Sequence, residues 1–215
     1  YNQYYFADSS DANNIYLTIV PNLRKNKSVI TRSNYLSNAL KEKIRNEIAD
    51  YKLLNSEIAF IDPVYLNLDI SLKLPGEPNR LSYKDQTKLV ITKEARTLIN
   101  EEDLKSKVFN VITNYINGLK LGDIIDVRFL NNELEKIQGI SSIETTRTDL
   151  GLDKRTVPGL SFCVFNPIYN GRDKKEFDTR CQLLPFQIPY IENPVAFKNK
   201  IQVKSLVTNK RVIEY

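Results

Sequence analysis

The side chains best suited to chemistry in this sequence are two groups of carboxylates. Glu101, Glu102 and Asp103 are consecutive, and Asp123 and Asp126 lie close together further along the chain. Two carboxylates can act as acid and base when their surroundings hold their pKa values apart, as in glycoside hydrolases. The first group, however, begins a segment with helical periodicity, where negative charge stabilises the helix dipole, and the second fits a solvated loop. A two-carboxylate hydrolase therefore stays an alternative and is not the favoured interpretation.

Other catalytic and metal-binding patterns are missing from the sequence. The chain contains no histidine, which removes the usual general base, the commonest metal ligand and every triad that depends on one. Gly118 and Gly122 have part of the spacing of a phosphate-binding loop, but no Gly-Lys-Ser/Thr follows them. Cys163 and Cys181 are best explained as reduced, partly buried thiols, and without histidine they make a poor metal site. We therefore expect no catalytic residue, metal, cofactor or enzymatic activity.

The element that must position the rest of the chain is a predicted strand over residues 64–74. Apolar and polar residues alternate there without interruption, which predicts a strand with one apolar and one polar face. Pro63 suits the entry to a strand, and Pro75-Gly76 suits its exit. Shorter runs of the same kind predict further strands near residues 15–19, 89–91 and 140–148.

Three segments have the period of amphipathic helices: about Ser33 to Lys52, Asn100 to Leu119, and 128–138. Thr31 or Ser33 can cap the first helix and Asn100 the second, while Gly139 suits a left-handed stop after the third. Each helix has an apolar stripe that we expect to be covered. The stripes are Leu36, Leu40, Ile44, Ile48 and Tyr51; Leu104, Val108, Ile112, Tyr115 and Leu119; and Leu130, Leu134 and Ile137.

These elements predict an α+β fold, with a small mixed sheet covered on one face by two long amphipathic helices and one short helix. We divide the chain into an arm with a first strand (1–30), an α+β core (31–149) and a β-rich, proline-containing extension (150–215). The second boundary follows the charge, because residues 1–149 hold 20 basic and 20 acidic side chains whereas 150–215 hold 11 and 6. The extension therefore carries the whole net charge of +5.

The extension is rich in aromatic residues and shows no helical period, so we expect it to lie against another surface. Aromatic side chains with few competing charges are typical anchors of protein interfaces. The candidate subunit-interface residues are Phe162, Phe165, Tyr169, Phe186 and Tyr190. The other interpretation, equally open, is that these rings pack on the chain's own sheet.

The extension also suggests a second class of function, a nucleic-acid-binding module. Basic residues alternate there with aromatic ones, a composition suited to phosphate contact and base stacking. The basic residues are Arg172, Lys174, Lys175 and Arg180. Asp173, Glu176 and Asp178 lie in the same stretch and would repel phosphate, so nucleic acid is the secondary hypothesis.

No apolar run approaches the length of a membrane span, and the start of the chain lacks the order of a signal peptide, so we expect no membrane partner. Because the chain begins at Tyr1, we expect a processed product or a fragment.

Several of these segments together resemble the baseplate J-like family of contractile phage tails. The matching pieces are the helix ending at Tyr51, the strand entry at 62–69 (DPVYLNLD), residues 114–123 (NYINGLKLGD) and residues 137–140 (IQGI). The resemblance covers about residues 33–149 and is greatest to the C-terminal part of wedge subunits of the T-even type. Its motifs are patterns of apolar and small residues.

The resemblance implies a structural role in a virion. Such subunits form the inner ring of the baseplate, hold its wedges around the central hub and take part in the rearrangement that triggers sheath contraction. We therefore expect a homodimer that builds a ring and joins other baseplate wedge proteins. The expected location is the tail baseplate, after assembly in the host cytoplasm.

Overall fold

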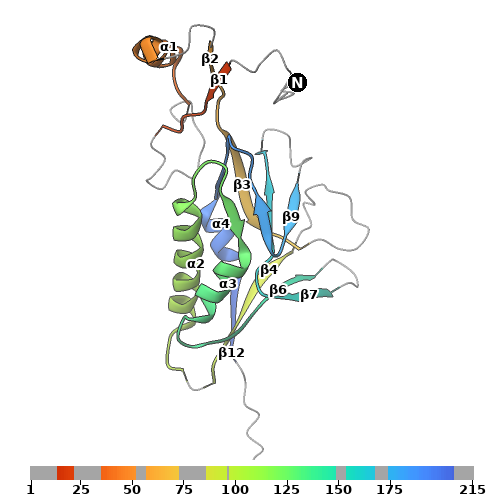
Figure 1. Ribbon diagram of the computed structural model, residues 1–215. Coiled ribbons are helices and arrows are strands. Elements are labelled where there is room, and N and C mark those ends of the chain that lie inside the picture. The colour runs from red at the N-terminus through yellow and green to blue at the C-terminus, as the bar shows by residue number, and fades with distance from the viewer. Residues whose placement is uncertain are drawn as a thin grey trace, which may run out of the picture. The chain divides into compact units, whose positions relative to one another are not determined.

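The computed structural model describes residues 14–21, 35–51, 57–72, 86–95, 97–148, 154–167 and 174–205 (Figure 1). The chain divides into two compact units, Tyr1–Val64 and Tyr65–Tyr215. Helices and several small sheets occur together, which confirms the predicted α+β class. The division differs from the predicted domains, because the strands after residue 150 belong to the same unit as those before it.

The first unit contains a helix and a pair of parallel strands. Strand β1 (Asn14–Leu17) pairs in parallel with β2 (Glu57–Phe60). Helix α1 (Asn38–Glu47) is followed by the short 3-10 helix η3 (Ala49–Tyr51). The helix begins later than the predicted Ser33, because the Ser37 hydroxyl accepts the Leu40 N–H and caps it. The predicted caps, Thr31 and Ser33, lie outside the described residues.

The strand with the alternating pattern is β3 (Val64–Ile70), which confirms its predicted type. It ends earlier than predicted, and Lys73 and Leu74 lie outside the described residues. Its polar face is also covered, since Asn67 is 9% exposed and contacts Glu192 from the far end of the chain. An alternating strand can therefore be buried on both sides when its polar residues find polar partners.

Two four-stranded sheets organise the second unit. The first has the order β11 (Gln187–Tyr190), β3, β8 (Phe162–Phe165) and β9 (Lys175–Phe177). The second has the order β12 (Ile201–Ser205), β4 (Lys88–Lys93), β6 (Ile140–Thr148) and β7 (Lys154–Pro158). This second sheet is mixed, as predicted, because β12 is parallel to β4 whereas β6 is antiparallel to both β4 and β7. A short ribbon pairs β5 (Ile124–Asp126) with β10 (Arg180–Gln182).

Three helices gather on one side of these strands (Figure 1). Helix α2 (Glu101–Gly118) packs against β12 and against α3 (Val127–Glu135), which in turn packs against β6. Asn100 caps α2 as predicted, and its side chain accepts the Glu102 N–H. Three positions of the predicted α2 stripe, Leu104, Val108 and Ile112, are buried, and Tyr115 and Leu119 are half-buried. Ile116, which the predicted stripe did not include, is buried as well. Within the second unit the described helices are one long helix, α2, and two short ones, while α1 belongs to the first unit.

The C-terminal segment spans both sheets. It supplies the outer strand β11 to the first sheet and β12 to the second, with helix α4 (Pro194–Asn199) between them. Phe197 on α4 is 2% exposed and lies against Phe109 and Phe162. We predicted no helix here, because a six-residue helix is too short to show a period. Its signals are local ones, a proline in the first turn and Asn193 as the cap.

Candidate functional site

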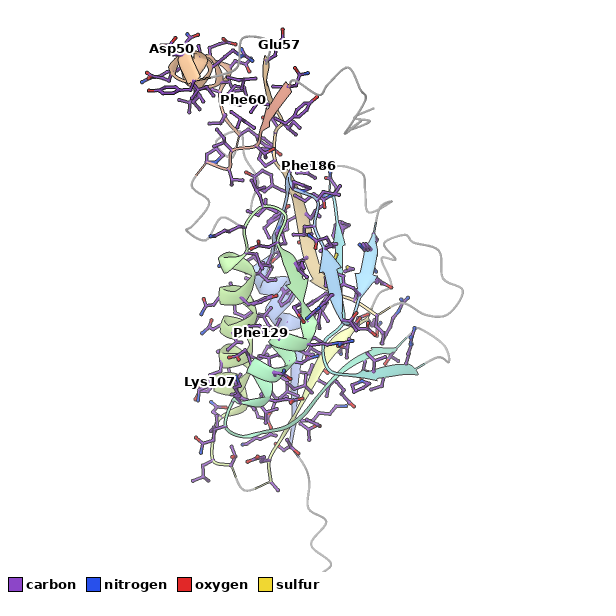
Figure 2. All side chains as sticks on the ribbon, in the orientation of Figure 1. Asp50, Glu57, Phe60, Lys107, Phe129 and Phe186 are labelled. Carbon is purple, nitrogen blue, oxygen red and sulfur yellow. The ribbon has the colours of Figure 1, made fainter. Side chains whose placement is uncertain are left out.

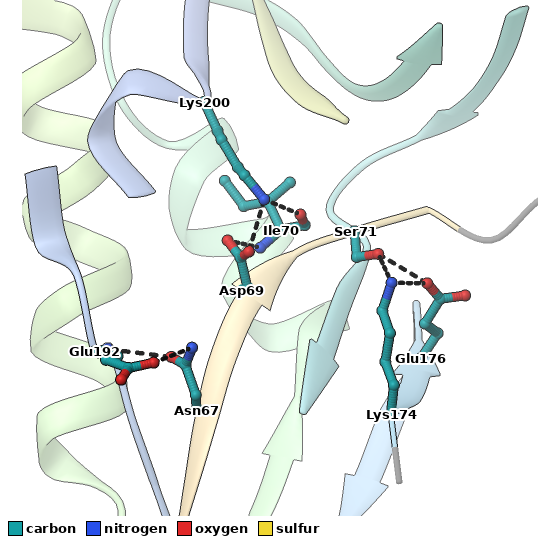
Figure 3. A network of polar contacts seen from close by, with 8 residues as sticks. All are labelled: Asn67, Asp69, Ile70, Ser71, Lys174, Glu176, Glu192 and Lys200. Carbon is teal, nitrogen blue, oxygen red and sulfur yellow. Dashed lines mark hydrogen bonds and ion pairs between the residues drawn. The ribbon is translucent and has the colours of Figure 1, made fainter. Parts of the chain in front are cut away.

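A row of polar side chains crosses three strands of the first sheet. Asn67 and Asp69 share one face of β3, and Ser71 continues their alternation just after the strand. Strand register places Cys163 of β8 opposite Asp69, and Glu176 of β9 opposite Cys163. We call these five residues the polar row. Lysines from two other segments reach it (Figure 3).

At one end of the polar row, two contacts attach the C-terminal segment to β3. Lys200 Nζ donates to Asp69 Oδ2 at 2.6 Å and to the Ile70 carbonyl at 3.1 Å. Asn67 donates its amide to Glu192 Oε2 at 3.2 Å and accepts the Glu192 N–H at 3.1 Å. The side chains of Lys200 and Asp69 are 25% and 29% exposed, so water screens this ion pair less than a fully exposed one.

At the other end, a lysine, a serine and a glutamate form a closed triangle. Lys174 Nζ donates to Ser71 Oγ at 2.6 Å, and it lies 2.8 Å from Glu176 Oε1. Ser71 Oγ in turn donates to Glu176 Oε1 at 2.7 Å. The triangle is buried, with Lys174 at 7% exposure and Ser71 at 1%. Glu176 Oε2 is also buried and has no hydrogen-bond partner among the described residues.

A serine beside a lysine can form a catalytic dyad when a neutral amine takes the serine proton. Here the amine of Lys174 is held in an ion pair with Glu176, and an ammonium group has no lone pair with which to accept a proton. Ser71 also lies under other atoms, out of reach of a substrate. The triangle therefore joins Ser71, which directly follows β3, to strand β9. It is not suited to nucleophilic chemistry.

The two cysteines are free and buried, as predicted. Burial raises the pKa of the Cys163 thiol to about 12. The positive charge of Lys174 lowers this pKa, and the negative charge of Asp69 raises it further. Burial likewise raises the pKa of Cys181. Because the thiolate is the nucleophile, neither side chain is suited to covalent catalysis at neutral pH.

The carboxylates singled out in the sequence have structural partners. Glu101, Glu102 and Asp103 occupy the first turn of α2, as predicted. A hydrogen bond from Lys198 lowers the pKa of Glu102. Asp123 Oδ2 accepts the Lys120 N–H at 2.8 Å, which closes a turn.

Asp126 serves as the N-cap of α3 and also binds Arg180 at 2.7 Å. Hydrogen bonds, first from the Phe129 N–H and then from Arg180, hold the pKa of Asp126 below its usual value. This low pKa suits a permanent charge and not a general acid.

Two of the basic residues singled out in the extension, Lys174 and Arg180, form ion pairs within the described part of the chain. Lys174 is buried against Glu176, and Arg180 is engaged by Asp126. Arg172 lies outside the described residues. The alternation of basic and aromatic residues is therefore broken by ion pairs that sequence spacing does not reveal.

The predicted interface aromatics lie mainly in the core. Phe162, Phe165 and Phe186 are buried at 0%, 7% and 3% exposure, and Tyr190 is half-buried with its ring edge-to-face against Tyr65. Tyr169 lies outside the described residues. This corrects the interface hypothesis for the three phenylalanines, because other parts of the same chain cover them, as aromatic rings of β9 and α4 cover Phe162.

An exposed apolar face occurs instead on α1. No residue of this helix is buried; Leu40 is 43% exposed, and Tyr51 on the following η3 is 88% exposed. Figure 2 draws the side chains of this unit, with Asp50, Glu57 and Phe60 labelled. Two basic residues attach the helix to β2 and to the segment after it: Arg45 donates to the Ile58 carbonyl on β2 at 3.4 Å, and Lys41 donates to Asp62, after β2, at 2.7 Å. The amphipathic pattern predicted that something covers the stripe. Within the described parts of the chain, Leu36, Ile44 and Ile48 are half-buried, whereas Leu40 and Tyr51 stay exposed.

Within the described ranges, no group of three or more potential ligand side chains could hold a metal ion. No helix in the described part of the chain is long and apolar enough to cross a membrane. In comparisons with known proteins, no family model matched this chain, and no curated protein sequence matched it.

Proposed function

We propose that this chain is a structural subunit of a phage contractile-tail baseplate, in the wedge or inner ring, and is not an enzyme. The observation that carries the proposal is the exposure of two apolar side chains of the amphipathic stripe, Leu40 on α1 and Tyr51 on η3. Apolar side chains that remain uncovered on an amphipathic helix are characteristic of a surface that another molecule covers.

The described part of the first unit supports the same proposal. Among the described residues of this unit, the sheet has two parallel strands, and the buried apolar residues are Ile58 and Pro63. Two strands alone are marginally stable, and parallel strands are normally covered on both faces. A unit of this kind gains stability from a partner, as a subunit of a larger assembly does.

The resemblance to the baseplate J-like family supplies the identity of the assembly. Its matching segments form the entry to β3, the end of α2 with the turn that follows, and the approach to β6. In this proposal the chain contacts a second copy of itself and neighbouring wedge proteins, and takes part in the rearrangement that triggers sheath contraction. It requires no cofactor, and its location is the virion tail baseplate after assembly in the host cytoplasm.

The test is to locate the chain in purified contractile tails. Antibody against the second unit should label the end of the tail that meets the host, and mass spectrometry should find the chain as a stoichiometric component. Tails from a phage whose gene is deleted should lack assembled baseplates. Absence of the chain from intact tails, or a deletion that leaves baseplates complete, overturns the proposal.

A further inference from the structure

The exposed face of α1 has a self-complementary order of side chains. Leu40, Lys43, Glu47 and Tyr51 are all exposed and follow one another at spacings of three or four residues, so they share one side of α1 and the turn after it. An apolar residue stands at each end of this face, and one positive and one negative charge stand between them. We call these four residues the α1 face.

The opposite side of α1 is already in use. Arg45 donates to Glu42 and to the Ile58 carbonyl, and its guanidinium lies 5.6 Å from the centre of the Phe60 ring. Lys41 pairs with Asp62. These contacts hold the helix to β2 by its basic side and turn the α1 face outward, so the exposure of Leu40 follows from how the helix is anchored.

The two charges of the α1 face have no partner in the described chain. Neither Lys43 nor Glu47 takes part in an ion pair or side-chain hydrogen bond among the residues that the structure describes. A helix that covers Leu40 and Tyr51 gains two ion pairs when it offers an acidic group to Lys43 and a basic group to Glu47, in the reverse order along its own length.

We propose that the partner of the α1 face is the same face of a second copy, with the two helices antiparallel. In that arrangement Lys43 lies opposite Glu47 of the second copy, Glu47 lies opposite its Lys43, and Leu40 meets its Tyr51. A parallel pair would instead place like charges together, which is unfavourable. This inference rests on the proposed function and names the surface through which copies meet.

The contact is weak by itself, because one short helix from each copy buries less than the roughly 1,200 Å² of a stable interface. In a ring, where each copy is held by further contacts, the effective concentration is high enough for a weak contact to form. We therefore expect a dimer of the isolated chain that dissociates on dilution in the micromolar range or above.

The test is charge reversal. Self-association of the full chain is measured by sedimentation velocity over a wide concentration range. Lys43→Glu places a glutamate opposite Glu47 at both symmetric contacts, and Glu47→Lys places a lysine opposite Lys43 at both. Each single variant should dimerise at least about tenfold more weakly than the wild type, since attraction becomes repulsion at the two contacts together. The double variant Lys43→Glu/Glu47→Lys should recover wild-type association.

Mixing gives the most specific outcome. The Lys43→Glu and Glu47→Lys variants should form a dimer with each other although neither does so alone. Lys107→Glu, an exposed change of the same charge on α2, is the matched control and should associate like the wild type. Circular dichroism identifies any variant that fails to fold. If a single variant does not fold, the inference is tested by whether the double variant recovers wild-type association.

A wild-type chain that stays monomeric at all concentrations, single variants that associate normally, or a mixture that does not pair overturns the inference. None of these outcomes affects the location of the chain in purified tails. The self-contact and the proposed function can therefore fail separately.

Discussion

The ammonium group of Lys200 lies 2.6 Å from the carboxylate of Asp69, and this contact joins the two four-stranded sheets of the second unit. Asp69 is on β3 of the first sheet, while Lys200 directly precedes β12 of the second. Lys200 also donates to the Ile70 carbonyl, so its side chain is bound to both the side chain and the backbone of β3. The C-terminal segment is thus an integral part of the core unit.

Replacing Asp69 by asparagine should destabilise the second unit. The side chain keeps its shape but loses its charge, and the partly shielded ammonium group of Lys200 is left with a weaker acceptor. We expect a loss of about 1–2 kcal/mol in the free energy of unfolding, measured by urea denaturation. Asp178→Asn is the matched control, because Asp178 is exposed, and it should change stability by less than about 0.5 kcal/mol. Equal effects from the two variants would show that the Lys200 contact contributes nothing.

The triangle of Lys174, Ser71 and Glu176 should behave as one energetic unit. Lys174→Met leaves the buried carboxylate of Glu176 without its cation, which should cost about 3 kcal/mol or more. Glu176→Gln leaves the buried ammonium of Lys174 without its anion and should cost a similar amount.

In the double variant Lys174→Met/Glu176→Gln no charge remains in the triangle, and the introduced glutamine can still accept the Ser71 hydroxyl. Its loss of stability should therefore be smaller than the sum of the two single losses by more than about 1 kcal/mol, as measured in a double-mutant cycle. Additive losses would mean that the two charges do not interact and that the observed contact is energetically silent.

Phe186→Ala should lower stability and should not act as an interface change. The ring is 3% exposed, so its removal leaves a cavity, and we expect a loss of about 3–5 kcal/mol in the free energy of unfolding. Val195→Ala, at a position 70% exposed on α4, is the control for loss of an apolar side chain at the surface. Weakened assembly with unchanged thermal stability in the Phe186 variant would restore the interface hypothesis.

Much of the second unit could be predicted from local patterns. The alternation around Leu68 predicted β3, and the cap Asn100 with its acidic first turn predicted the start of α2. Gly139 has φ +95 as its predicted left-handed role requires, and an added Cβ would come within 2.8 Å of the Thr97 side chain. These features depend on neighbouring residues, so sequence spacing is enough to reveal them.

The polar row and the α1 face could not be predicted in the same way. The register that aligns Asp69, Cys163 and Glu176 depends on pairing between segments far apart in the sequence. The stripe of α1 indicated that a face needs cover, but periodicity does not reveal whether the cover comes from the same chain. A similar limit applies to Phe162, because an aromatic ring in a β-rich segment is equally compatible with a core and with an interface.

The buried thiol of Cys163 should make stability fall at alkaline pH. Its pKa is raised from 9.0 to about 12 by burial, so the folded chain keeps the proton that the unfolded chain releases above pH 9. The stabilising contribution is therefore complete below pH 9, and it declines by about 1.4 kcal/mol per pH unit between the unfolded and folded pKa values.

Other groups also titrate in this range, so the wild type is compared with the variant Cys163→Ala. The measurement is the difference between their unfolding free energies at about pH 8, 9, 10 and 10.5, which lie on either side of the unfolded pKa. The wild type should lose stability relative to the variant above pH 9, because alanine has no proton to release. Cys181 is present in both proteins and cancels from the difference. A difference that stays constant over this range would mean that the thiolate of Cys163 is accommodated in the folded protein.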